Sequence, residues 1–217
     1  MNRVQKKTAI VTGGANGIGF HCCRELLRNG AKGRFLSFNS SFTANVRFIH
    51  FFLLSSGVFN SAVEALGGLD IFINNAGIFN DVTWQTEIQV NFMGAVNLTL
   101  LAYDYMGTHK GGKGGVIANV SSVLGLVVKG HVPVYTATKH AILSFTVCLK
   151  VRGSLRISCP VLQVPGTCLL LQSNLCENVA KAMVELIEKG ANGAIWISEG
   201  DKPPYEVELA KYECIDC

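Results

Sequence analysis

The chain has 217 residues, of which 49% are hydrophobic, 16% are charged and 23 are glycines, and its formal net charge is +4. This composition predicts one compact domain over residues 1–217 and excludes disordered and fibrous proteins. The few charges are scattered, without a basic run interleaved with aromatic residues, so nucleic acid is not expected as a partner.

No stretch is expected to span a membrane. The longest apolar stretch, residues 48–59, is too short for a bilayer and is interrupted by His50 and Gly57. The N-terminus lacks the apolar core of a signal peptide, so we expect a cytoplasmic protein with its eight cysteines reduced. Cys214 and Cys217 have C-x-x-C spacing but neither a second pair nor a neighbouring His, and no metal site is expected.

The first predicted elements are a strand, a glycine-rich turn and a helix. Residues 8–11 form a short β-rich run that leads into the sequence TGGANGIG, and residues 17–29 are predicted to be helical up to Gly30. This arrangement is typical of one βα half of a dinucleotide-binding unit, although a purely structural strand-to-helix turn looks similar.

Three glycines of this turn have distinct expected roles. Gly13 would permit the tight turn, and Gly17 would let backbone N–H groups approach a pyrophosphate. Gly19 would let the helix pack closely on the strand.

The next region, residues 33–53, is predicted to be irregular. Strands are expected at residues 33–38 and 46–53, but the connection at residues 39–45 is too short for the crossover helix that parallel neighbours need. Either the pair is antiparallel or this edge of the sheet is loosely held.

The rest of the chain alternates strands with helices. Buried strands are predicted at residues 69–73, 115–120 and 193–197, and helices at 84–106, 134–150 and 178–189. Strands without polar alternation are typical of a parallel sheet covered on both faces. The alternation predicts an α/β fold with a doubly wound parallel sheet, the Rossmann fold, with a shortened connection between the second and third strands.

Three polar residues follow the strands in the order Ser122, Tyr135 and Lys139. A free tyrosine titrates near ~10, so it needs a neighbouring cation to act as a base near neutral pH. Lys139 lies one helical turn beyond Tyr135 and would supply that cation, while the Ser122 hydroxyl would hold the substrate oxygen. A Tyr and a Lys four residues apart by chance are the alternative, which the order and position of all three residues disfavour.

These motifs, together with Asn91 and the sequence from Asn74 to Gly77, resemble the short-chain dehydrogenase/reductase family. The resemblance implies that Tyr135 is the general base, that Lys139 binds the nicotinamide ribose and lowers the Tyr135 pKa, and that Ser122 orients the substrate. It implies that Asn91 holds a water in a proton relay.

The resemblance also implies a nicotinamide cofactor and a small alcohol or ketone substrate, with a hydroxylated lipid such as a prostaglandin as one candidate. It makes helices 84–106 and 134–150 the candidate interface of a homodimer or homotetramer, although their apolar positions could equally belong to the core of one chain. The implied cofactor-binding residues are Gly13, Asn16, Gly17, Ile18, Gly19, Asn75, Ala76, Gly77, Tyr135 and Lys139.

The choice of cofactor is left open by the region after the second strand. Ser37 and Phe52 stand where the family has acidic residues, and no Asp or Glu lies between Glu25 and Glu64. The resemblance implies NAD, but Arg34 or Arg47 could accept the 2′-phosphate of NADP.

The segment after Lys150 is short for a substrate lid, and either Pro160 or the pair at residues 165–166 could stand beside the nicotinamide. Two alternatives to a working enzyme remain open. One is a truncated, weak or inactive relative that acts as a dinucleotide-binding or dimerising interaction protein. The other is an imperfectly spliced product of a normal enzyme.

Overall fold

The computed structural model describes residues 4–36, 56–149, 155–163, 173–199 and 202–208. Several expectations therefore lie outside the described residues: the acidic positions at Ser37 and Phe52, the strand at residues 46–53, the pair at residues 165–166, and the C-x-x-C sequence at the end of the chain.

The described strands form one mostly parallel sheet. Its order is β2-β1-β3-β4-β6-β7-β8, with β5 also paired to β6, and only β7 and β8 are antiparallel. The strands are β1 (Thr8–Thr12), β2 (Lys32–Leu36), β3 (Ile71–Asn74), β4 (Val116–Asn119), β5 (Ser121–Ser122), β6 (Arg156–Gln163), β7 (Ile195–Glu199) and β8 (Tyr205–Val207).

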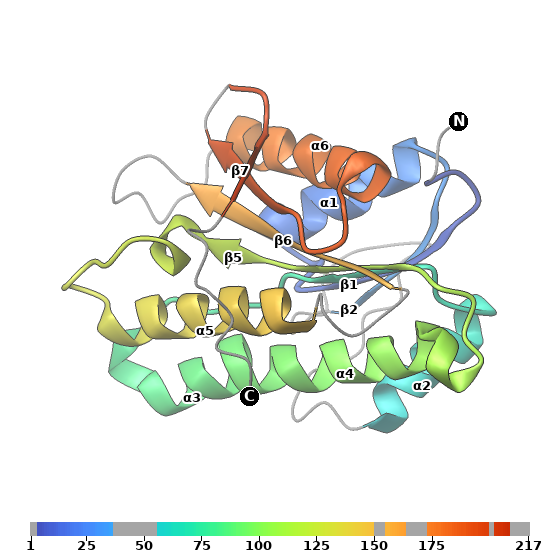
Figure 1. Ribbon diagram of the computed structural model, residues 1–217, viewed down its shortest axis with the longest axis horizontal. Helices are drawn as coiled ribbons and strands as arrows, with labels where there is room; N and C mark the ends of the chain where they lie inside the picture. The colour runs from blue at the N-terminus through green and yellow to red at the C-terminus, as the bar shows by residue number, and fades with distance from the viewer. Residues whose placement is uncertain (1–3, 37–55, 150–154, 164–172, 200–201, 209–217) are drawn as a thin grey trace.

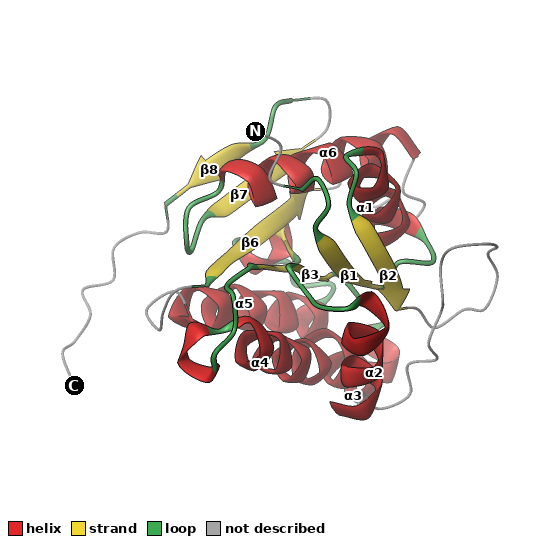
Figure 2. Cartoon of the chain, turned by 90° about the vertical axis from the view of Figure 1, so that its right-hand side faces the viewer, coloured by secondary structure: helices red, strands yellow, loops and turns green. Residues whose placement is uncertain are grey.

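Helices cover both faces of this sheet. Helices α1 (Gly17–Arg28) and α6 (Ser173–Lys189) lie on one face, and α2 (Ser56–Leu66), α4 (Ala95–Met106) and α5 (Pro133–Leu149) lie on the other (Figures 1 and 2). The shorter helices are η1 (Asp81–Thr83), α3 (Trp84–Ile88), η2 (Gln89–Gly94), η3 (Thr108–Lys110) and η4 (Val123–Gly125). The predicted doubly wound α/β fold is confirmed.

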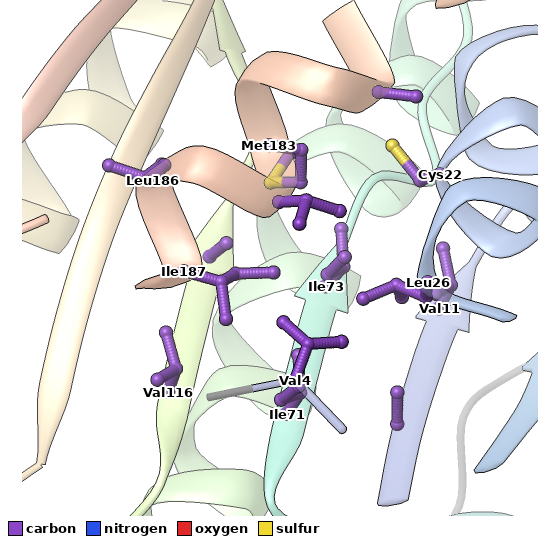
Figure 3. Packing of buried hydrophobic residues seen from close by; sticks show 14 of the residues in the cluster. Val4, Val11, Cys22, Leu26, Ile71, Ile73, Val116, Met183, Leu186 and Ile187 are labelled. Carbon is purple, nitrogen blue, oxygen red and sulfur yellow. The ribbon is translucent and has the colours of Figure 1, made fainter. Parts of the chain in front are cut away.

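Alternate residues of the central strands point to opposite faces of the sheet and belong to two separate hydrophobic cores. Val11, Ile73 and Val116 pack beneath α1 and α6 (Figure 3), whereas Ile10 and Phe72 belong to the core beneath α2 and α4. All five side chains are buried. Strands that are apolar on both sides fit a sheet enclosed between two helical layers.

The helix predicted over residues 84–106 is one rod with three different parts. It begins as α3, continues as the π-helical η2 and ends as α4. Because a π-helix bonds residue i to i+5, this segment inserts an extra residue that sequence periodicity does not show.

Towards the C-terminus, the elements also differ from the sequence-based expectation. Helix α6 begins at Ser173 instead of residue 178, β7 spans Ile195–Glu199 instead of 193–197, and β8 was not predicted. Pro160 lies buried inside β6, where the partner changes from β4 to β5. A proline has no N–H for a ladder hydrogen bond, so this change of partner suits it.

The edge region is partly described. β2 pairs with β1 in parallel, with Thr8 opposite Lys32, and α2 follows before β3. The crossover from β2 to β3 therefore does contain a helix. The shortened connection expected at residues 39–45 is outside the described residues and stays a prediction.

A chain of buried side-chain hydrogen bonds crosses the middle of the fold. Thr12 Oγ1 donates to Asn74 Oδ1 (3.3 Å), and Asn74 Nδ2 donates to Thr99 Oγ1 (3.2 Å). Thr99 donates to Asn119 Oδ1 (2.7 Å), whose Nδ2 donates to Thr146 Oγ1 (3.1 Å). Thr146 then donates to the carbonyl of its own helix, so every hydroxyl both accepts and donates. The chain joins β1, β3, α4, β4 and α5.

Candidate active site

The glycine turn lies between β1 and the N-terminus of α1. Gly13 and Gly17 have φ angles of +68° and +52°, which a residue with a side chain rarely adopts. Asn16 caps α1, its Oδ1 accepting the N–H of Gly17 at 2.7 Å. The backbone freedom predicted for Gly13 is therefore observed.

Gly19 is required for a different reason. A Cβ there would overlap the carbonyl oxygen of Gly13 and lie 2.5 Å from Asn75 Nδ2. The close contact is thus between α1, its own turn and the end of β3. Ile18, beside it, packs against the core beneath α1 and α6.

The end of β3 is held against this turn by Thr12. Its Oγ1 accepts the N–H groups of Asn75 and Ala76, both at 2.9 Å, and Asn75 Nδ2 donates to the Thr12 carbonyl at 3.0 Å. Asn75 was expected to line the cofactor site. Its side chain joins the ends of β1 and β3, and its role in cofactor binding stays a prediction.

These features fit the phosphates of a dinucleotide. The turn is backbone without side chains at Gly13 and Gly17, and the first turn of α1 carries no acidic residue. An anion there would meet the positive end of a twelve-residue helix.

Ser122, Tyr135 and Lys139 come together at the carboxyl end of the sheet. The Ser122 hydroxyl accepts the Leu124 N–H at 3.2 Å and is close enough to the Tyr135 phenol to affect its pKa. Lys139 Nζ lies 5.5 Å from the centroid of the Tyr135 ring and donates to the Val120 carbonyl at 3.2 Å. The structure therefore unites the three residues selected from the sequence.

The acidities of Tyr135 and Lys139 are set mainly by burial. Burial raises the pKa of Tyr135 to about 12, although the nearby Ser122 hydroxyl opposes this rise and the charge of Glu87 adds to it. Burial lowers the pKa of Lys139 to about 8, against the opposing effects of Cys159 and Glu87. Lys139 Nζ lies near the Tyr135 ring, and the lowering of the Tyr135 pKa by this lysine stays a prediction.

Asn91 lies in the π-helical η2 and is 2% exposed. Its Nδ2 donates to the Ile78 carbonyl and its Oδ1 accepts the Ile78 N–H, both at 2.8 Å. A Cβ on Gly77 would lie 3.3 Å from Asn91 Oδ1 and 3.6 Å from Lys139 Nζ. Gly77 therefore keeps the space between these two polar groups open. The water expected at Asn91 stays a prediction.

Three contributors to the site were not selected from the sequence. Asp81 accepts the N–H groups of Val134 and Tyr135 at 2.8 and 3.2 Å, and so caps α5 from another element. Phe79 contacts the Tyr135 ring edge-on at 4.7 Å between centroids, and Glu87 is fully buried nearby. No local pattern signals them, because the partners of Asp81 and Phe79 lie far away along the chain and the burial of Glu87 depends on how the elements pack.

A glycine turn at the first strand of a doubly wound sheet, with a Ser, Tyr and Lys trio at the carboxyl end of the strands, defines a nicotinamide-dependent oxidoreductase fold. The family model described as short chain dehydrogenase matches residues 55–164. The chain belongs to the short-chain dehydrogenase family.

Relatives and solved structures agree with this family. The 15-hydroxyprostaglandin dehydrogenase (NAD(+)) of Rattus norvegicus is 32% identical over 92% of this chain and 78% of that protein. The Homo sapiens protein of the same name is 35% identical over 66% of this chain, and the match spans only 60% of that protein's length. A short chain dehydrogenase from Mycobacterium smegmatis superposes with a TM-score of 0.76 at 20% identity, covering 93% of this chain and 95% of its own.

These comparisons confirm the resemblance and the expected enzyme class, an oxidoreductase that acts on CH–OH groups. Within the part of the chain that the structure describes, no helix is both long and apolar enough to cross a membrane. In the same residues, no three His, Cys, Asp or Glu side chains gather as a metal site would require.

Proposed function

We propose that the protein oxidises a secondary alcohol to a ketone with NAD. The observation that carries this proposal is the convergence of Ser122, Tyr135 and buried Lys139 at the end of the sheet where the glycine turn also lies. The bound nicotinamide would accept the hydride. The names of the relatives support NAD over NADP.

Each residue of the trio has a separate task in this proposal. The Ser122 hydroxyl orients the alcohol oxygen, and Tyr135 takes the hydroxyl proton. Lys139 is the cation that opposes the cost of burying a phenolate. Asn91 holds the loop at Ile78 in place through its two backbone hydrogen bonds, which keeps the space at Gly77 open beside Lys139.

We infer that the substrate is a hydroxylated lipid of the prostaglandin kind. Apolar side chains are exposed on two segments of the chain that precede Tyr135. They are Phe79 just before η1, Val82 in η1 and Trp84 in α3, and Val127 and Val128 between η4 and α5. A long apolar substrate would bury them. The names of the relatives support this substrate class.

We also infer that copies of the chain associate through α4 and α5. Met93, Leu100 and Tyr105 are exposed along the rod that contains α4. Burying such side chains favours a homodimer or homotetramer. Analytical ultracentrifugation will show a single monomeric species if this inference is wrong.

A cofactor titration followed by an assay tests the proposed reaction. Nicotinamide fluorescence should show NADH binding more tightly than NADPH, and NADH should form when NAD is mixed with 15-hydroxylated prostaglandins or other secondary alcohols. Cofactor binding without turnover of any alcohol would contradict the proposed reaction, and binding of neither cofactor would contradict the proposed site.

The rate of alcohol oxidation is expected to rise with pH and to level off above about 8, the pKa of Lys139. Oxidation needs the Tyr135 and Lys139 pair to have lost one proton, and the first proton leaves with the lower of the two values. In Lys139→Arg the guanidinium keeps its proton, so the rising limb should move towards the Tyr135 value of about 12. The measurement is kcat/KM against pH at constant ionic strength. If kcat/KM of the variant rises over the same pH range as that of the wild type, the rise does not report the Lys139 pKa.

A further inference from the structure

Glu87 is a buried carboxyl group for which the reaction above has no use. It lies on α3 with none of its surface exposed, and its Oε1 accepts the Asn80 N–H at 2.8 Å. Its Oε2 is also buried and has no hydrogen-bond partner within the described residues. One N–H does not offset the cost of an ionised carboxylate in such a place, so the neutral acid is favoured.

Asp81 is the carboxyl group that faces it, at the start of η1. Its two oxygens accept the N–H groups of Val134 and Tyr135, in the first turn of α5. Both oxygens therefore act as hydrogen-bond acceptors at the positive end of a helix. Asp81 is thus placed to be the hydrogen-bond acceptor of the pair.

The two carboxyl groups lie within hydrogen-bonding reach of each other. Burial is the largest cause that raises the Glu87 pKa, with the charge and hydrogen bond of Asp81 adding to it. The Asn80 N–H and the charge of Lys139 oppose this rise. A partner for the free Glu87 oxygen thus exists only when that oxygen carries a proton, because two carboxylates have no hydrogen to share.

We propose that Glu87 and Asp81 share one proton, with Glu87 as the protonated partner, and that this pair is a positioning device for Tyr135. The Glu87 O–H donates to Asp81, which in turn holds the first turn of α5, where Tyr135 lies. The pair thereby links α3, η1 and α5. This role rests on the proposed function, in which Tyr135 is the base.

The protonated state of Glu87 also matters for charge. The titratable groups that face it are Asp81 from η1 and both Tyr135 and Lys139 from α5. An ionised Glu87 would raise the pKa of Tyr135 and so oppose the phenolate. A shared proton removes that opposition while keeping the hydrogen bond.

Infrared difference spectroscopy tests the shared proton without any need for activity. The C=O stretch of a protonated carboxylic acid should be present at neutral pH in the whole protein and lost in Glu87→Gln. Glu185→Gln, which removes an exposed glutamate paired with Lys189, is the matched control and should leave the band unchanged. If the wild type has no such band, or if Glu87→Gln retains it, the proposal is wrong.

The pH dependence of stability gives a second test. The folded pKa of Glu87 lies above its ordinary value of 4.5, so folding binds a proton there and stability falls as pH rises from 4.5 through the folded value. Glu87→Gln lacks this loss, so its midpoint of urea unfolding should rise relative to the wild type over that pH range. A relative midpoint that falls as pH rises would show an ionised, stabilising Glu87 and overturn the proposal.

Kinetics tests the positioning role. Glutamine accepts from Asn80 and donates to Asp81 as a protonated glutamate would, so Glu87→Gln should keep kcat within about twofold. Glu87→Met keeps the shape without the hydrogen bonds, and kcat should fall about tenfold or more with little change in the KM for NAD. Equal losses in the two variants would refute positioning through this pair. An enzyme inactive with every alcohol would instead refute the proposed function, and the infrared and unfolding measurements would still decide the shared proton.

Discussion

Tyr135→Phe is expected to lower kcat for alcohol oxidation by about 10²- to 10⁴-fold, the range for loss of a general base. The variant removes only the phenolic oxygen, so the ring keeps its contacts with Phe79 at 4.7 Å and with Lys139. Cofactor affinity should therefore hardly change. The measurements are single-turnover rates and an NADH titration of the same protein.

Tyr105→Phe is the matched control for this experiment. It makes the same chemical change at an exposed position of α4 and should leave kcat unaltered. A Tyr135→Phe enzyme with the activity of the control would assign the base to another group.

Gly19→Ala is expected to weaken both the fold and cofactor binding. The new methyl group would overlap the Gly13 carbonyl and lie 2.5 Å from Asn75 Nδ2. The Gly13 carbonyl belongs to the backbone, so it cannot move away as a flexible side chain could. Overpacking of this kind costs about 1–3 kcal/mol, or a Tm lower by about 2–12 °C for a chain of this size. Because the overlap displaces the turn itself, NADH affinity should fall at least about tenfold, a loss worth ~1.4 kcal/mol.

Gly130→Ala is the corresponding control. A Cβ at Gly130 meets nothing within 4 Å, so both Tm and NADH affinity should stay at the wild-type values. Calorimetry and fluorescence titration of the two variants separate a general effect of alanine from the overlap at Gly19. Equal behaviour of the two would show that the turn tolerates a side chain.

Much of the framework could be predicted because its signals are local. The glycine turn, the apolar strands and the i, i+4 spacing of Tyr135 and Lys139 depend on residues near one another in the chain. The trio meets because the carboxyl ends of parallel strands share one edge of the sheet. That geometry follows from the fold class alone.

Features that depend on distant partners could not be predicted. The helical spacing of residues 84–106 does not reveal the extra residue of η2 at Asn91, since one inserted residue hardly disturbs an apolar face. Asp81 and Glu87 look like ordinary surface acids of a turn and a short helix. Their importance comes from α5, about 50 residues further on, as the separation of Asp81 from Val134 shows.

The pKa values of Tyr135 and Lys139 could not be predicted from the sequence either. Four-residue spacing indicates that Lys139 lies near Tyr135, but not that the ammonium group donates to the Val120 carbonyl. Nor does it show how deeply both groups are buried, which is the main cause of both pKa shifts. Burial is a property of the assembled layers.

The buried chain of hydrogen bonds from Thr12 to Thr146 acts as a check on strand alignment. If the register of β3 or β4 shifted by one residue, Asn74 or Asn119 would point to the opposite face of the sheet. Its hydrogen bonds to the neighbouring side chains would then be lost. Each polar group stranded in this way costs about 1–3 kcal/mol, so a misaligned sheet loses several at once. The five elements that carry the chain are far apart in sequence, and only the correctly threaded topology satisfies all of them.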